Sequence, residues 1–118
     1  HEEICTYEVC KLAKEKGFNE KCNFYYQKGV ISTDGCFNRY NKGVEYICSA
    51  PTQSLLQRWL REEKNIDIAI VPLYTGGYSY IVYNIHCRDN RVVNTNAGYD
   101  TYELALEDAL KYALENLV

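Results

Sequence analysis

Three segments of the chain repeat apolar residues at the spacing of an amphipathic helix. They run from about residue 6 to 16, from 52 to 64, and from 100 to the last residues of the chain. In each segment apolar side chains recur every three or four positions and charged side chains occupy most of the others, so one face of a helix can be buried. The pattern predicts three helices that each pack one side against an apolar layer.

Residues that begin and end helices stand at the borders of these segments. Thr6 and Thr52 can each accept a backbone hydrogen bond at a helix N-cap, and Asp100 and Glu103 have the spacing of a capping box. Gly17 can adopt the left-handed conformation that ends many helices. We therefore expect the helices to begin at the two threonines and at Asp100, and the first helix to end at Gly17.

Four segments between the helices are rich in aromatic and β-branched residues, which favour strands. Thr75, Gly76 and Gly77 separate two of them and predict a hairpin turn. The stretches 28–43 and 88–98 are polar and are predicted to be loops, with Val92 and Val93 as a possible short extended pairing. The predicted strands are 22–27, 44–48, 66–74 and 78–87.

The predicted order is α-β-β-α-β-β-α, and the first two strands are expected to pair antiparallel across the 28–43 connection. Three amphipathic helices and two hairpins are best accommodated by an antiparallel sheet with the helices on one face. The 118 residues fall within the size of one domain. The fold class predicted from the sequence is therefore a two-layer α+β protein, with residues 1–118 as a single domain.

The composition is that of a folded protein. Apolar residues make up 47% and charged residues 25%, which is ordinary globular usage, and no apolar run approaches the roughly 20 residues of a membrane helix. The net charge is −3, and residues 60–118 hold five Lys or Arg against nine Asp or Glu. Phosphate backbones are bound by dense basic patches, so this charge argues against nucleic acid as the main partner, and no membrane contact is expected.

The six cysteines are predicted to be reduced, partly buried thiols of a cytoplasmic protein. Their even number would also fit disulfides, but most of them lie inside the predicted elements and a chain of this size does not need crosslinks. No close Cys-x-x-Cys pair is present, and Cys5 and Cys10 would lie roughly 140° apart around a helix. We therefore predict no metal site and no cofactor.

No catalytic residues are predicted. His86 is the only internal histidine, so any Cys–His or Ser–His pair would have to include it, with Cys36 or Cys48 as the candidate thiols. A nucleophile elbow and a glycine-rich oxyanion segment are both missing. The Thr-Gly-Gly stretch at 75–77 lacks the lysine and the following helix of a phosphate-binding loop. These observations predict a protein that is not an enzyme.

Twelve tyrosines are the one unusual feature of the composition. Tyrosine is common in protein interfaces, but it is also common in strands because it suits a half-buried pleated surface, and the sequence leaves both readings open. Tyr78 and Tyr80 should share one face of their strand and Tyr83 should lie on the other. The candidate binding residues are Tyr26, Tyr46, Tyr78, Tyr80, Tyr83 and Arg88.

Three segments resemble a known family: 9–18 (VCKLAKEKGF), 50–66 (APTQSLLQRWLREEKNI) and 99–117 (YDTYELALEDALKYALENL). They are similar to small uncharacterised proteins encoded by phages and mobile elements of gut Bacteroidales. The resemblance covers most of the chain outside the 28–43 and 88–98 loops. It implies a bacterial cytoplasmic setting and brings no catalytic residues with it.

Together these observations predict a non-enzymatic interaction protein. It would bind a protein partner or associate with itself through a tyrosine-rich sheet face beside the 28–43 loop. The alternative is a small-molecule or nucleotide binder that uses the same aromatic face as a stacking platform.

Overall fold

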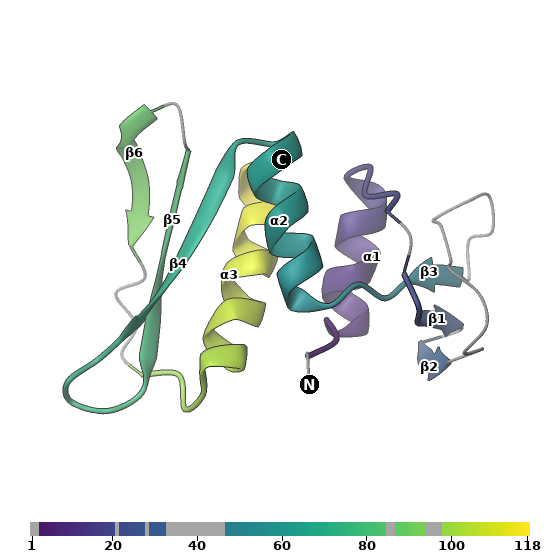
Figure 1. Cartoon of the computed structure of the whole chain (residues 1–118), viewed down its shortest axis with the longest axis horizontal. Helices are drawn as coiled ribbons and strands as arrows, with labels where there is room; N and C mark the ends of the chain where they lie inside the picture. The colour runs from purple at the N-terminus through teal and green to yellow at the C-terminus, as the bar shows by residue number, and fades with distance from the viewer. Residues whose placement is uncertain (1–2, 21, 28, 33–46, 85–86, 94–97) are drawn as a thin grey trace. The chain divides into compact units, whose positions relative to one another are not determined.

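The computed structural model describes residues 3–20, 22–27, 29–32, 47–84, 87–93 and 98–118 (Figure 1). The chain divides into two compact units, an N-terminal unit of His1–Thr52 and a C-terminal unit of Gln53–Val118. Each unit combines helix with antiparallel strands, so the predicted α+β class is confirmed. The strands form two three-stranded sheets, one in each unit. That residues 1–118 form a single domain stays a prediction.

The N-terminal unit contains one helix and one small sheet. Helix α1 spans Tyr7–Glu15, and the strands are β1 (Tyr25–Gln27), β2 (Val30–Ser32) and β3 (Ile47–Ser49). The sheet order is β2-β1-β3 with antiparallel pairing throughout. The predicted antiparallel pairing of the first strand with the one at 47–49 is therefore confirmed. Strand β2 was not predicted, because Lys28 to Gly43 lacks the apolar alternation of a strand.

Both ends of α1 follow from local chemistry. The Thr6 side chain accepts a hydrogen bond from the Val9 N–H at 3.4 Å, as an N-cap residue does. After the helix, Gly17 has a φ of 97° and the Phe18 N–H bonds back to the Ala13 carbonyl at 2.9 Å. Phe18 is then almost fully buried. The predicted start at Thr6 and stop at Gly17 are both confirmed.

The C-terminal unit is a three-stranded sheet with two helices on one face (Figure 1). Its sheet order is β4-β5-β6, antiparallel throughout. Helix α2 packs against β4, and helix α3 packs against β4 and β5. The elements are α2 (Gln53–Glu63), β4 (Ile66–Pro72), β5 (Tyr78–Asn84), β6 (Cys87–Val93) and α3 (Tyr102–Asn116).

Two sequence expectations for this unit are corrected. The sequence predicts loop over 88–98 apart from a short extended pairing of Val92 and Val93. That pairing is confirmed, with Val92 opposite Val82 and Val93 opposite Ile81, but the loop prediction for 88–91 is wrong because β6 begins at Cys87. The register of β6 with β5 shifts between Tyr83 and Asn84. This polar strand has no hydrophobic alternation that would reveal it. Asp100 was expected to begin the last helix, but Thr101 is the N-cap and its side chain accepts the Leu104 N–H at 3.1 Å.

The outer edge of β4 is closed by side chains. The N–H and C=O of Tyr78 both form backbone hydrogen bonds with Tyr99, so neither is available to Pro72, the register partner of Tyr78 on β4. Tyr78 and Pro72 therefore form a non-hydrogen-bonded pair. Non-hydrogen-bonded pairs recur at every second residue of antiparallel strands, so Ile68 and its partner on β5 form another such pair. The N–H and C=O of Ile68 therefore point away from β5, toward the outer edge of β4. Asp67 Oδ1 accepts from this N–H at 3.0 Å, and Gln57 Nε2 donates to this carbonyl at 3.0 Å. Because the N–H and C=O of Ile68 are already hydrogen-bonded to side chains, a strand of another molecule cannot pair with β4 at this position. We call this part of the β4 edge blunted.

Gln53 ties the first turn of α2 to α3. Its side chain is only 4% exposed. Its Nε2 donates to the Glu103 carbonyl and to Glu107 Oε1, both at 2.9 Å. A buried amide that donates two hydrogen bonds fixes how the two helices sit on the sheet, because each acceptor loses a partner if the helices shift.

Replacement of this amide should therefore destabilise the fold. We expect Gln53→Ala to lower the free energy of unfolding by about 1–3 kcal/mol, the usual cost of leaving buried polar groups unpaired. Urea unfolding followed by circular dichroism measures this change. Glu62→Ala, at an exposed position of the same helix, is the control and should change stability by less than about 0.5 kcal/mol. Equal stability of the two variants would show that the Gln53 bridge contributes nothing.

Candidate functional site

The tyrosines of β5 divide between the two faces of the sheet, as the alternation of a strand predicts. Tyr80 lies on the face covered by the helices and is 6% exposed. Tyr78 shares that face and is half-buried, with its ring 6.1 Å from the ring of Tyr102 on α3 in an edge-on arrangement. Tyr83 lies on the opposite face. The predicted separation of Tyr83 from Tyr78 and Tyr80 is therefore confirmed, and these three candidate tyrosines do not form one surface.

Tyr80 belongs to a group of three tyrosines and one aspartate between β5 and α3. Its ring lies 6.2 Å from that of Tyr99, whose hydroxyl donates to Oδ2 of Asp108. Tyr112 follows Asp108 by one helical turn, so both lie on the same side of α3. We call Tyr80, Tyr99, Asp108 and Tyr112 the tyrosine–aspartate cluster. Tyr80 is its buried member, and the other three are half-buried.

The electrostatics of this cluster are dominated by burial and by one carboxylate. Burial raises the pKa of Tyr80 to about 12, and the nearby Asp108 carboxylate adds to that increase, followed by Tyr99 and Tyr112. A phenol with this pKa stays protonated and is a hydrogen-bond donor at neutral pH. The cluster is thus one negative charge surrounded by neutral phenols.

The position of Tyr99 in this cluster depends on a glycine. Gly77 has a φ of 84°, and a Cβ built on it would lie 2.8 Å from the Tyr99 carbonyl oxygen. The two backbone hydrogen bonds between Tyr78 and Tyr99 need this close approach. Any larger residue at 77 would therefore push the Tyr99 segment away from β5.

The face of the sheet opposite the helices carries a tyrosine–carboxylate pair. The Tyr83 hydroxyl donates to Asp67 Oδ2 at 3.1 Å, and Asp67 Oδ1 accepts the Ile68 N–H. The hydrogen bond to Asp67 raises the pKa of Tyr83, with the charge of the same carboxylate as the next cause. Tyr83 and Asp67 are register partners, so the hairpin itself brings them together.

The same face carries half-exposed apolar side chains. Ala69 and Ile81 are register partners, and Val71 lies opposite Ser79. Ala69, Val71 and Ile81 are neither buried nor fully exposed. We call the surface formed by Asp67, Ala69, Val71, Ile81 and Tyr83 the open sheet face, since both described helices of this unit pack on the other side.

The candidate tyrosine of the N-terminal unit is part of its internal packing. The Tyr26 hydroxyl donates to the Cys5 carbonyl at 2.8 Å, and its ring lies 5.4 Å from that of Tyr7. Tyr25, the neighbour of Tyr26 on β1, is buried. Tyr26 thus holds α1 to the sheet of this unit and is a weaker binding candidate than Tyr83.

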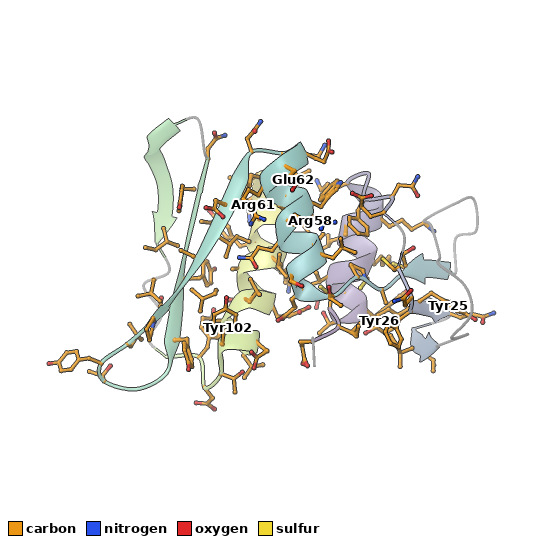
Figure 2. All side chains as sticks on the ribbon, in the orientation of Figure 1. Tyr25, Tyr26, Arg58, Arg61, Glu62 and Tyr102 are labelled. Atoms are coloured by element: carbon orange, nitrogen blue, oxygen red, sulfur yellow. The ribbon has the colours of Figure 1, made fainter. Side chains whose placement is uncertain are left out.

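The structure does not describe the side chains of several other candidate residues. Tyr46, Cys36 and His86 lie outside the described residues, and Arg88 is described only through its backbone position in β6. The Cys–His arrangement weighed from the sequence is therefore not tested. Arg58 is exposed on α2 with Arg61 and Glu62 beside it (Figure 2).

The candidate residues predicted from the sequence omit every member of these two sites except Tyr80 and Tyr83, and the omitted polar members are Asp67, Tyr99, Asp108 and Tyr112. The pairing of Asp67 with Tyr83 could have been predicted, because counting residues outward from the Gly76-Gly77 turn along both strands places the two opposite one another. Tyr112 and Asp108 are separated by one helical turn, which was also visible in the sequence. Tyr99 was not accessible in this way, because its contact with Tyr80 depends on how the segment before α3 folds back beside β5.

Four buried cysteines lie in the N-terminal unit as free thiols: Cys5, Cys10, Cys22 and Cys48. Burial raises the pKa of Cys22 to about 12, and the nearby Cys5 and Cys48 add to this. Burial likewise raises the pKa of Cys48 to about 11, against a lowering effect of Lys14. Thiols with these pKa values are protonated at neutral pH and are poor nucleophiles.

Within the described residues, no group of three or more His, Cys, Asp or Glu side chains is arranged to hold a metal ion. No helix in the described part of the chain has the length and hydropathy that a membrane crossing requires. No protein-family model matches the chain, and neither a curated protein nor a solved structure is significantly similar to it.

The raised pKa of Cys22 makes a prediction about alkaline stability. Because the folded state holds this proton more tightly than the unfolded chain, the stabilisation is fully present below pH 9 and is lost as the pH rises toward 12. We expect the free energy of unfolding in Cys22→Ala to fall less steeply above pH 9, by up to about 1.4 kcal/mol per pH unit.

Urea unfolding at pH 7 to 10.5 with a phosphine reductant measures this difference. Val9→Ala is the matched control, because it truncates a buried side chain of the same unit without removing a titrating group. It should be less stable than the parent protein at every pH but keep the parental slope. A parental slope in Cys22→Ala as well would mean that this thiol titrates alike in both states.

Proposed function

We propose that this chain is a non-enzymatic interaction protein that associates with a second copy of itself through the open sheet face. The observation that carries this proposal is the row of half-exposed apolar side chains, Ala69, Val71 and Ile81, on the side of the sheet away from the helices. A sheet with one face on a core usually presents polar side chains on its other face. Apolar side chains at those positions favour burial against a partner.

The polar groups of this face are compatible with burial. Both oxygens of Asp67 already accept hydrogen bonds, one from Tyr83 and one from the Ile68 N–H. Removing a carboxylate from water costs least when its acceptors are satisfied. The blunted edge of β4 directs association to the face of the sheet, since strand addition at that edge is blocked at Ile68.

The shape of the face favours a second copy over an unrelated protein. Two sheets pack face to face with their side chains interdigitated, and a two-fold axis presents the same patch from both sides. The small Ala69 lies across from the large Ile81, so a two-fold operation can place the Ile81 of one protomer over the Ala69 of the other. Binding of a different protein to this face is the competing outcome.

The size of the face sets the strength of this association. Three strands of seven residues cover roughly 300 Å² in the plane of the sheet. Two such faces bury well under the roughly 1,200 Å² of a stable complex. We therefore propose a weak dimer whose population depends on protein concentration.

The setting of this protein is part of the same proposal. The resemblance to small proteins of Bacteroidales phages and mobile elements suggests that origin, and the four buried free thiols support a reducing, cytoplasmic compartment. The nucleotide-binding alternative has less support. The described tyrosines of the helix-covered face surround the carboxylate of Asp108, which repels phosphate.

A charge placed on the open sheet face should abolish the dimer. We expect Ile81→Lys to weaken self-association at least about tenfold, because the dimer would then bury an unpaired ammonium group. Sedimentation velocity over a concentration series measures the association constant. Leu104→Lys is the matched control, because Leu104 is a 53% exposed apolar residue on α3 and should leave association unchanged.

Two outcomes would contradict the proposal. One is a parent protein that sediments as a monomer at every concentration up to the millimolar range. The other is an Ile81→Lys variant that is folded by circular dichroism and associates as strongly as the parent protein. Loss of association in Leu104→Lys alone would place the contact on α3 instead of on the sheet.

A further inference from the structure

The tyrosine–aspartate cluster has the chemistry of a site for a positively charged organic group. We infer that Tyr80, Tyr99, Asp108 and Tyr112 bind a small organic ammonium ion, held by the carboxylate and the surrounding phenol rings. This inference is independent of the proposed dimer, because the cluster lies on the helix-covered side of the sheet. Aromatic rings attract cations through the negative potential of their faces, and the effect is greatest where water is excluded.

Among the side chains that the structure describes, the Asp108 carboxylate has no cationic partner. The hydrogen bond that the structure gives Asp108 is the one from Tyr99 to Oδ2. Its second oxygen is therefore available to a ligand. Asp108 is half-buried, so an ammonium ion beside it would interact more strongly than at an exposed carboxylate.

Tyr80 provides a second, independent indication of a ligand. It is 94% buried, counting from its exposure of 6%, and its hydroxyl has no hydrogen-bond partner among the described residues. Buried polar groups are nearly always hydrogen-bonded, so an unpaired one calls for an explanation. The groups around this hydroxyl are those of the cluster. A bound ligand or its water would supply the missing partner.

The surroundings of the cluster select for positive charge. Helix α3 and the residue pair before it contain five carboxylates and one lysine. A field of this sign attracts cations and repels phosphates and carboxylates. The carboxylates are Asp100, Glu103, Glu107, Asp108 and Glu115, and the lysine is Lys111.

An organic cation fits the cluster better than a metal ion does. Calcium takes six to eight oxygen ligands, usually with several carboxylates, whereas the cluster offers one carboxylate. No metal-binding group of three acidic, His or Cys side chains exists among the described residues. Phenol rings are suited to large, weakly hydrated cations such as methylated ammonium groups, which are recognised by aromatic side chains in many proteins.

Titration with tetramethylammonium chloride, followed by ¹⁵N NMR, tests this inference on the whole chain. We expect saturable shifts of the amides of Tyr99, Asp108 and Tyr112, with a dissociation constant in the millimolar range. Sodium chloride at the same concentration controls for ionic strength. tert-Butyl alcohol, which is neutral and of similar shape, should give no saturable shifts at these amides.

Four variants distinguish the contribution of the charge to cation binding from that of the aromatic ring and from effects on the fold. Asp108→Asn removes the charge and should weaken binding about tenfold or more, whereas Glu115→Gln removes a charge from an exposed position of the same helix and should not. Tyr112→Leu should weaken binding, whereas Tyr112→Phe keeps the ring and should retain it. The last pair keeps the test valid even if loss of the Asp108 charge loosens the Tyr99 segment.

Three results would overturn the inference. They are the absence of saturable shifts with tetramethylammonium, equal affinity for tert-butyl alcohol, and undiminished binding in both Asp108→Asn and Tyr112→Leu. The Ile81→Lys variant tests whether cation binding depends on the proposed dimer. If it no longer self-associates but still binds the cation, the two functions are separate properties of one unit.

Discussion

The register of β4 against β5 is the constraint on which the C-terminal unit depends. Pairing from Ile66↔Asn84 to Pro72↔Tyr78 without interruption puts every second side chain of both strands under the helices. A slip of one residue would exchange the two faces. It would expose the buried Ile68 and Val82 and would bury Asp67, so the register is held by the same apolar contacts that build the core.

This register also assigns different chemistry to the two faces. Under the helices, Tyr80 meets Tyr99 and Asp108 and creates a half-buried carboxylate among phenols. On the other face, Asp67 and Tyr83 satisfy one another and leave an apolar surface around them. We therefore propose a small cation as the ligand of one face and a second copy of the chain as the partner of the other. The tyrosine content of the chain serves both faces and the internal packing of the N-terminal unit.

Much of the fold could be predicted from local signals. Thr6, Gly17 and the Gly76-Gly77 turn act through their own backbone neighbours, and the structure has each boundary where the sequence places it. The sequence predicts only the Val92–Val93 end of β6, because the polar part of this strand lacks alternation and is recognisable only from its pairing with β5. The choice of Thr101 over Asp100 as the N-cap could not be predicted for a similar reason. Both residues are of a type that caps helices, and only the conformation of the chain leading into α3 decides which of them is the N-cap.

Residue spacing along the chain is enough to assign which side chains share a face of each strand and each helix, because the periods of 2 and 3.6 residues are properties of the backbone. This spacing separates Tyr78 and Tyr80 from Tyr83. What each face contacts depends instead on how the elements pack together. The contacts of Tyr80 with Tyr99, and of Tyr99 with Asp108, join β5, the segment before α3 and α3 itself, and the position of Tyr99 follows from the close approach at Gly77. Such contacts have no local period, so no sequence pattern could have shown them.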